Sequence, residues 1–274
     1  MQIAYLGYDL LSPCLTALSE GGCTVMEVFS FPTDNEFEFN REVSGFAQRQ
    51  GIPYTEKRIQ LEDIHRLKEA GCEAIFCAGY LYRVPVDHSV PMVNVHPALL
   101  PVGRGAWPMP VTILRGMRES GVTLHKMEAD FDTGDILLQR AVPVEPEETL
   151  ETLTEKLRDA GAELCRQMAA DFDRLWAAGW PQGPGEYWPD PQKPDYTITW
   201  RTPPQETDCI LRAFFGYECF LQQGEQEHRI VRGRFFPKEH RRPFGTVEQC
   251  PGGGRRFFVN GGVIEEPPAL SKHP

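Results

Sequence analysis

The stretch VNVHPALLP, residues 93–101, combines an apolar strand pattern with two polar side chains, Asn94 and His96. Side chains two positions apart on a β-strand point to the same face, so these two are expected to project together. Pro97 has no backbone N–H and favours an extended conformation at His96, so the chain is expected to leave the sheet there. The pattern indicates an amide and an imidazole side by side at the end of a strand.

On the N-terminal side of this stretch, strand and helix patterns alternate. Residues 73–79, EAIFCAG, form a continuous apolar run typical of a central parallel strand. Strands are also predicted at residues 3–8, 24–31 and 52–59, and helices after Ser12-Pro13 and at residues 43–50 and 61–70. The alternation predicts an α/β fold with a Rossmann-like open, mostly parallel sheet and flanking helices. Ligands of such sheets bind at the carboxyl ends of the strands, which is where His96 is expected.

On the C-terminal side, a helix is predicted at residues 107–118 and strands at 121–127 and 135–144. Apolar residues at spacings of three and four from Leu150 to Leu175 predict one long helix over residues 148–178. Residues 179–194 are dense in Pro and Gly. Short strand patterns follow, together with a helical piece at residues 206–214, and predict a small β-rich module like a partly open barrel. The predicted division is a catalytic domain at 1–180, a linker at 181–194 and a small C-terminal domain at 195–274.

The composition narrows the class of protein. The net charge is −11, and residues 1–185 carry the whole excess, with 16 basic against 27 acidic residues. Such a surface repels phosphate backbones, so nucleic-acid binding is not expected. No apolar run approaches 18 residues and the N-terminus lacks a secretory pattern, so a cytoplasmic protein without a membrane segment is expected. The eight cysteines form no C-x-x-C pair, which predicts reduced thiols and no metal site.

A second polar cluster lies at FDTGD, residues 131–135, where Gly134 permits a tight turn before an apolar strand. The carboxylate of Asp132 is expected to approach His96. Together with Asn94, the two groups supply an oxyanion donor, a proton acceptor and a group that orients the imidazole. The sequence contains no G-x-S-x-G elbow, so direct attack by one substrate on another is expected, without a covalent enzyme intermediate.

These motifs resemble those of a known family. NVHPALLP at residues 94–101, Arg104-Gly105, GVTLHKM at 121–127 and DTGD at 132–135 are similar, in this order, to the N-terminal domain of the folate-dependent formyltransferases. The family includes methionyl-tRNA formyltransferase, glycinamide ribonucleotide formyltransferase and the sugar N-formyltransferases. The resemblance covers residues 1–180, and the tail resembles more weakly the C-terminal module of methionyl-tRNA formyltransferase.

The resemblance implies formyl transfer from 10-formyltetrahydrofolate, as co-substrate, to an amine. It implies that Asn94 binds the oxyanion, that His96 stabilises it and assists proton movement, and that Asp132 holds His96 and relays a proton through water. The implied folate-binding residues lie in three loops: Tyr82, Arg83, Val84, Ala98, Leu99, Leu100, Pro101, Ala129 and Asp130. Asp135 is expected either to be structural or to act directly. His125 is expected to belong to the core or to support the site, and Arg104 either to be solvated or to organise the site or the acceptor.

The acceptor is less well defined by the sequence. The loop after the second predicted strand, TDNEFEFNRE at residues 33–42, carries four acidic residues against one arginine, which repels a tRNA backbone. A small-molecule amine is therefore predicted, most of all a nucleotide-linked amino sugar. Methionyl-tRNA stays open as an acceptor, because five arginines of the tail, Arg229, Arg232, Arg234, Arg241 and Arg242, can form a basic patch. A formyltetrahydrofolate hydrolase and a non-catalytic folate-binding protein also stay open, as does the oligomeric state, with a homodimer as one option.

Overall fold

A computed structural model describes residues 1–268, which form two compact units. The first unit comprises Met1–Pro108, Arg118–Pro143 and Thr154–Pro189. The second comprises Met109–Met117, Val144–Leu153 and the described chain from Asp190 onward. Residues 181–189, in the predicted linker, therefore belong to the first unit.

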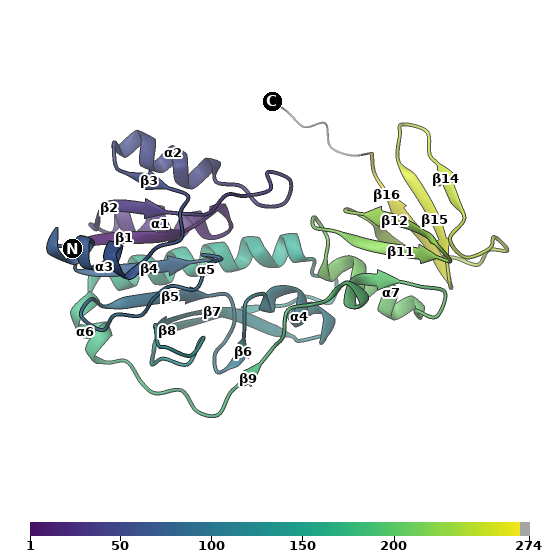
Figure 1. The fold of residues 1–274 in the computed structure, drawn as a ribbon. Coiled ribbons are helices and arrows are strands. Elements are labelled where there is room, and N and C mark those ends of the chain that lie inside the picture. The colour runs from purple at the N-terminus through teal and green to yellow at the C-terminus, as the bar shows by residue number, and fades with distance from the viewer. Residues whose placement is uncertain (269–274) are drawn as a thin grey trace. The chain divides into compact units, whose positions relative to one another are not determined.

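The first unit is built on a seven-stranded sheet in the order β3-β2-β1-β4-β5-β7-β8 (Figure 1). Neighbouring strands from β3 to β5 pair in parallel, whereas β7 pairs antiparallel with both β5 and β8. The predicted α/β fold with an open, mostly parallel sheet is confirmed. The strands are β1 (Gln2–Gly7), β2 (Thr24–Phe29), β3 (Tyr54–Thr55), β4 (Ala74–Ala78), β5 (Met92–His96), β7 (Glu119–Lys126) and β8 (Ile136–Pro143).

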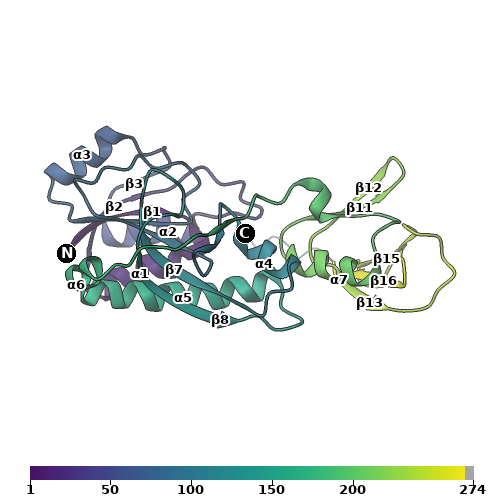
Figure 2. The same ribbon diagram turned by 90° about the horizontal axis from the view of Figure 1, so that it is seen from below.

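Helices cover both faces of this sheet. The helix α1 (Ser12–Glu20) lies with α5 (Leu150–Ala170) on one face, and α3 (Leu61–Glu69) lies on the other (Figure 2). Gly161 of α5 allows close approach to α1, because a Cβ there would lie 3.0 Å from the sulfur of Cys14. The helix α2 (Arg41–Gln50) follows β2, and its first backbone N–H groups are capped by the carboxylate of Asp9, in the short 3₁₀ helix η1 (Asp9–Leu11).

The prediction of a single long helix at residues 148–178 is wrong, because the helix is interrupted. It is divided into α5 and α6 (Phe172–Ala177), and Asp171 between them has non-helical angles of φ −152° and ψ 50°. Beyond the break, the ring of Phe172 packs edge-on against Phe76 of β4, with ring centres 6.2 Å apart. The apolar spacing of three and four continues across Asp171, so periodicity alone does not reveal the break.

Four further elements differ from the sequence prediction. The predicted strand at residues 52–59 is reduced to the two residues of β3. The predicted helix at 107–118 is shorter, α4 (Pro108–Leu114), because the chain turns at Gly116 with φ 60°. Two short strands that the sequence did not predict, β6 (Val102–Arg104) and β9 (Glu186–Tyr187), pair with each other in parallel.

The second unit is rich in strands, as predicted. It contains a three-stranded sheet, β10-β11-β12, and a four-stranded sheet, β13-β16-β15-β14, with the helix α7 (Pro204–Ala213) close to the predicted helical piece. The stretch HRIVRGRFF, residues 228–236, is divided between two strands at Gly233, where a Cβ would lie 2.5 Å from Ile230. The elements are η2 (Lys193–Tyr196), β10 (Thr197–Ile198), β11 (Cys219–Gln223), β12 (Gln226–Ile230), β13 (Arg234–Pro237), β14 (Val247–Gln249), β15 (Arg255–Val259) and β16 (Gly262–Glu266).

Two sequence expectations concern the whole described chain. All eight cysteines are free thiols, six of them buried. Among the helices of residues 1–268, none combines the length and the apolar content needed to cross a bilayer.

The first prediction concerns the apolar stripe of α5. Leu157 is completely buried, so Leu157→Ala should lower the free energy of unfolding by about 2–5 kcal/mol through lost burial and the cavity left behind. Glu155, two residues away and exposed, provides the control, and Glu155→Ala should change the value by less than about 0.5 kcal/mol. Urea unfolding measures both. Equal effects of the two substitutions would show that α5 does not pack on the sheet through this stripe.

Candidate active site

The polar groups of the motif lie at the carboxyl end of β5, between β4 and β7. Asn94 is opposite His125 of β7 and His96 is opposite Thr123, so two polar side chains of each strand share one region of the sheet. The strand β5 is itself held between two neighbouring strands, β4 and β7, so the backbone that carries Asn94 and His96 is fixed. The site therefore begins where β5 leaves the sheet, as the sequence predicted.

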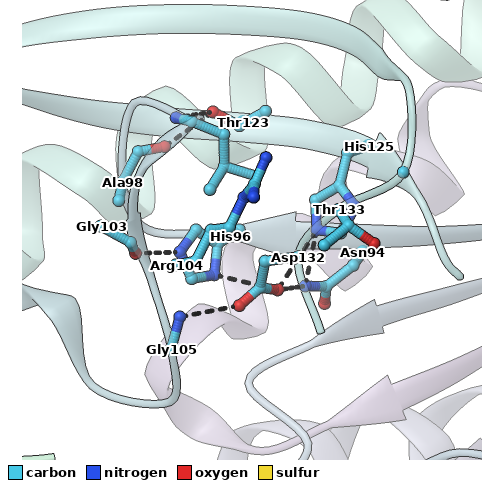
Figure 3. A network of polar contacts seen from close by, with 12 residues as sticks. Asn94, His96, Ala98, Gly103, Arg104, Gly105, Thr123, His125, Asp132 and Thr133 are labelled. Atoms are coloured by element: carbon cyan, nitrogen blue, oxygen red, sulfur yellow. Dashed lines mark hydrogen bonds and ion pairs between the residues drawn. The ribbon is translucent and has the colours of Figure 1, made fainter. Parts of the chain in front are cut away.

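Asp132 reaches this region from the turn between β7 and β8, which brings the three predicted catalytic residues together (Figure 3). Its carboxylate oxygen Oδ1 lies 3.6 Å from Nδ1 of His96 and accepts from the amide of Asn94 at 3.3 Å. The other oxygen, Oδ2, accepts from the backbone N–H of Gly105 at 2.9 Å. Asp132 is only 9% exposed, so the negative charge is held almost out of water by these contacts.

The environment of His96 fixes the proton on one ring nitrogen. The imidazole is 4% exposed, and its Nε2 donates to the carbonyl of Gly103 at 2.8 Å. Burial lowers the pKa of His96 below its ordinary 6.5, and the nearby Asp132 carboxylate offsets part of that effect. At neutral pH the ring is therefore neutral, with the Nε2 proton in place and the lone pair on Nδ1. The nitrogen that can take a proton is the one that faces Asp132.

The pKa of Asp132 is shifted in the opposite direction to that of an isolated buried acid. Burial would raise it, but the charge of His96, a hydrogen bond with His125 and the N–H of Gly105 together lower the pKa to about 2. The charge of His96 exerts this effect in acid, where its imidazole carries a second proton. Asp132 is thus a carboxylate at every pH at which His96 is neutral.

His125 orients the amide of Asn94. Its Nδ1 lies 2.7 Å from the carbonyl of Lys126 and must donate to it, so Nε2 is an acceptor in the neutral ring. The amide nitrogen of Asn94 lies 3.1 Å from this Nε2 and directs its second hydrogen to Asp132. Both amide hydrogens of Asn94 therefore have protein acceptors. His125 is thus a buried ring that contacts two of the predicted catalytic residues, Asn94 and Asp132.

The loop of residues 98–101 is attached to β7 and β8. The hydroxyl of Thr123 donates to the carbonyl of Ala98 at 2.7 Å and accepts from the N–H of Leu100 at 3.1 Å. The amide of Gln139 donates to the carbonyl of Leu100 at 2.7 Å and to the hydroxyl of Thr123 at 3.0 Å. Ala98 and Leu100 are buried, while Leu99 and Pro101 are partly exposed. The loop is thus rigidly placed beside His96.

The other predicted folate-binding residues form a second group. Arg83 donates to the carbonyl of Ala129 at 3.0 Å, and its guanidinium lies over the ring of Phe131. Tyr82 and Val84 pack into an apolar cluster with Met92 and Met127, while Ala129 and Asp130 are exposed. A cavity of about 140 Å³ borders this group, lined by Val86, Asp87, His88, Val90, Pro91, Met92, Lys126, Met127, Glu128 and Trp176.

The sequence did not predict the contacts of four residues around the catalytic groups: Gly103, Gln139, Gln182 and Gly105, which was noted only as part of the Arg104-Gly105 motif. Gly103 and Gly105 have φ angles of 80° and 124°, and the spacing of two glycines around Arg104 was the available signal. Gln182 lies in the Pro- and Gly-rich segment, where the composition gives no signal for a site. Its amide links Arg104 to the turn that carries Asp132, so the side chain of Arg104 is bonded within this network.

Other polar residues near the turn have structural partners. Asp135 forms an ion pair with Lys126 at 3.0 Å. Within residues 1–268, no group of three His, Cys, Asp or Glu side chains is arranged to hold a metal ion.

The depressed pKa of Asp132 predicts a pH-dependent contribution to stability. Because its pKa is about 2 in the folded protein against 3.8 for a free side chain, the ionised form stabilises the fold above pH 4, by about 2 kcal/mol. That contribution is lost as the pH falls from 4 through 2. The difference in unfolding free energy between the native chain and Asp132→Asn should therefore shrink by about 1 kcal/mol between pH 6 and about pH 3. A difference independent of pH would contradict the paired, ionised state of Asp132.

Solved structures resemble this chain over nearly its whole described length. HypX from Aquifex aeolicus aligns with 97% of this chain and 43% of its own, at 17% identity and a TM-score of 0.71. An N-formyltransferase from Helicobacter canadensis, in complex with folinic acid and dTDP-3-aminofucose, aligns with 97% of this chain and 98% of its own. The identity is 19% and the TM-score 0.67. These similarities establish a shared fold.

Sequence comparison places the chain in a family. The methionyl-tRNA formyltransferase of Synechococcus sp. (strain JA-3-3Ab) is 36% identical over 162 residues, which are 58% of this chain and 50% of that protein. The chain thus spans about half the length of this relative. The sequence model described as formyl transferase matches residues 15–168, more than half of the chain and the whole span that contains Asn94, His96 and Asp132. The chain belongs to the formyl transferase family.

Proposed function

We propose that this protein transfers a formyl group from 10-formyltetrahydrofolate to the amine of a small molecule. The observation that carries the proposal is the convergence of Asn94, His96 and Asp132 at the end of β5, with His96 neutral and Asp132 ionised. Family membership supports the reaction class. The complex of the Helicobacter canadensis enzyme with folinic acid supports a folate donor.

The geometry supports a separate role for each group in this proposal. As the amine nitrogen attacks the formyl carbon, a C–N bond forms and negative charge develops on the formyl oxygen. An N–H of Asn94 stabilises this charge once the amide gives up its longer contact, the 3.3 Å bond to Asp132. Nδ1 of His96 takes the proton that the amine loses, and the proton then passes to N10 of the folate as the old C–N bond breaks. Asp132 stabilises the imidazolium that forms between these steps.

The proposed donor site lies between the two groups of predicted folate-binding residues. In this proposal the partly buried side chains of Tyr82 and Met127, which pack on buried Val84 and Met92, contact the pteridine. The loop of residues 98–101, which Thr123 fixes, begins two residues after His96. This arrangement would present the formyl group at the end of β5.

Charges on the surface favour a small acceptor over tRNA. In the acidic loop after β2, Asp34 accepts three backbone N–H groups, so the loop is fixed with Glu36 exposed. Of the five arginines that make up the sequence-predicted basic patch, Arg229, Arg232 and Arg242 pair with Glu218, Glu151 and Glu248. Ion pairing removes much of the positive field that a phosphate backbone needs. The dTDP-3-aminofucose bound by the Helicobacter canadensis enzyme supports a nucleotide-linked amino sugar as the acceptor class.

A second candidate acceptor is methionyl-tRNA, because relatives at 30–36% identity carry the name methionyl-tRNA formyltransferase. The two acceptors require the same chemistry at His96. They differ in whether catalysis falls steeply with added salt, as binding of a polyanion does.

The proposed reaction predicts the effect of replacing the site residues. Asn94→Ala and His96→Ala should each lower the turnover number about 100- to 1000-fold, because a preorganised group acting at the transition state is lost. In the native chain the rate should fall as the pH drops through the lowered pKa of His96, below 6.5, because protonation removes the base. Initial rates of tetrahydrofolate release across pH measure both. Full activity of His96→Ala would exclude the proposed base.

The acceptor is tested with a panel of nucleotide-linked amino sugars, other small amines and initiator methionyl-tRNA, each incubated with 10-formyltetrahydrofolate. Mass spectrometry should detect a gain of one formyl group on an amino sugar, and His96→Ala should abolish it. Formylation of methionyl-tRNA alone would replace the small-molecule proposal with the second candidate. Release of formate without any amine would identify a hydrolase, and folate binding without turnover would identify a non-catalytic protein.

A further inference from the structure

We propose that Gln182 is a positioning residue of the formyl transfer site, which holds the turn that carries Asp132. The inference rests on the proposed function for its effect on catalysis. Gln182 lies in a segment of residues 182–188, here called the strap, which follows α6 and contains β9. The strap belongs to the same unit as the site.

The side-chain amide of Gln182 binds the backbone on both sides of the turn. Its Nε2 donates to the carbonyl of Asp132 at 3.0 Å and to the carbonyl of Gly134 at 2.7 Å. Asp132 has φ 56°, in the left-handed region that is unfavourable for residues with a side chain. Such a conformation persists only where the surroundings enforce it. The two hydrogen bonds of Gln182 supply that enforcement from a segment 50 residues further along the chain.

The strap that presents Gln182 is itself fixed to the chain beside His96. The Oε1 atom of Gln182 accepts from Arg104 at 2.8 and 3.3 Å. Backbone bonds run from Glu186 to the carbonyl of Pro101, at 3.0 Å, and from Trp188 to the carbonyl of Arg104, at 2.7 Å. Gly185 passes so close that a Cβ there would lie 2.4 Å from the carbonyl of Pro101. Gln182 is therefore held in place by its own side chain and by the backbone bonds of the strap that follows it.

These contacts close a ring of interactions around the catalytic pair. Gly103 accepts from His96 and Gly105 donates to the carboxylate of Asp132, while Arg104 between them binds Gln182. The same three-residue segment thus positions the imidazole, the carboxylate and the residue that holds the turn. Without Gln182, one side of this ring is lost, and the distance from the carboxylate to Nδ1 of His96 is no longer fixed.

The consequence is measurable at His96 itself. The charged and titratable groups around the pair are Asp132 from the turn, His125 from β7 and the thiol of Cys77 on β4. Of these, Asp132 raises the pKa of His96. A carboxylate that moves away lowers that pKa further. A change limited to overall stability would leave it unchanged.

The test uses Gln182→Met, which keeps the size and the neutral charge of the side chain but removes the hydrogen bonds. The turnover number is expected to fall about 10- to 100-fold with little change in KM, because misplacing a catalytic group affects the transition state more than binding. The pKa of His96, followed by NMR of its ring protons, is expected to fall. Gln182→Asn, whose shorter amide reaches one carbonyl at a time, should lie between Gln182→Met and the native chain.

Gln167→Met is the matched control, because Gln167 is an exposed residue of α5 in the same unit and bonds only to the side chain of Glu163 among the described residues. It should match the native chain in turnover and in the pKa of His96. An unchanged pKa of His96 in Gln182→Met would overturn the inference. If the native chain transfers no formyl group to any acceptor, the proposed function fails, and the NMR titration alone decides the role of Gln182. If Gln182→Met does not fold, Gln182→Asn decides it by the same two measurements.

Discussion

The site depends on keeping one carboxylate ionised in a place that water hardly reaches. A buried charge is costly unless hydrogen bonds and opposite charges compensate for the lost solvent. Asp132 obtains this compensation from two parts of the chain, the N–H of Gly105 and the amide of Asn94 on β5. The ring of His125 on β7 contributes by holding that amide in place. The position of these elements is therefore as important to the site as the residue types.

The fold provides that position through β7, which pairs antiparallel with β5 and β8 at one side of an otherwise parallel sheet. Because β7 runs antiparallel to β5, Asn94 lies opposite His125 and His96 lies opposite Thr123. The last residue of β7, Lys126, lies opposite Val93, so the loop that follows β7 begins near the start of β5. Asp132 reaches Asn94 and His96 because this loop folds back along β5.

Much of this arrangement was predictable because it is encoded locally. The apolar run of β4, the Asn-x-His spacing on β5 and the Gly after Asp132 each have a direct structural meaning, and they predicted the sheet and the meeting of the three groups. The contributions of Gln139 and Gln182 were not predictable, because an amide that binds backbone carbonyls of a distant loop leaves no pattern in its own neighbours. The break at Asp171 was not predictable for a related reason. The apolar spacing of three and four continues across it, while the contact of Phe172 with Phe76 of β4 is between residues far apart in the sequence.

The central claim is that a neutral His96 presents an unprotonated Nδ1 to an ionised Asp132. Nitrogen NMR of the protein labelled with ¹⁵N in its histidines tests this directly, because protonated and unprotonated ring nitrogens have well-separated chemical shifts. At neutral pH the account predicts that His96 carries its proton on Nε2, bound to the carbonyl of Gly103, and none on Nδ1. A proton on Nδ1 at that pH, in either the neutral or the cationic ring, would contradict it.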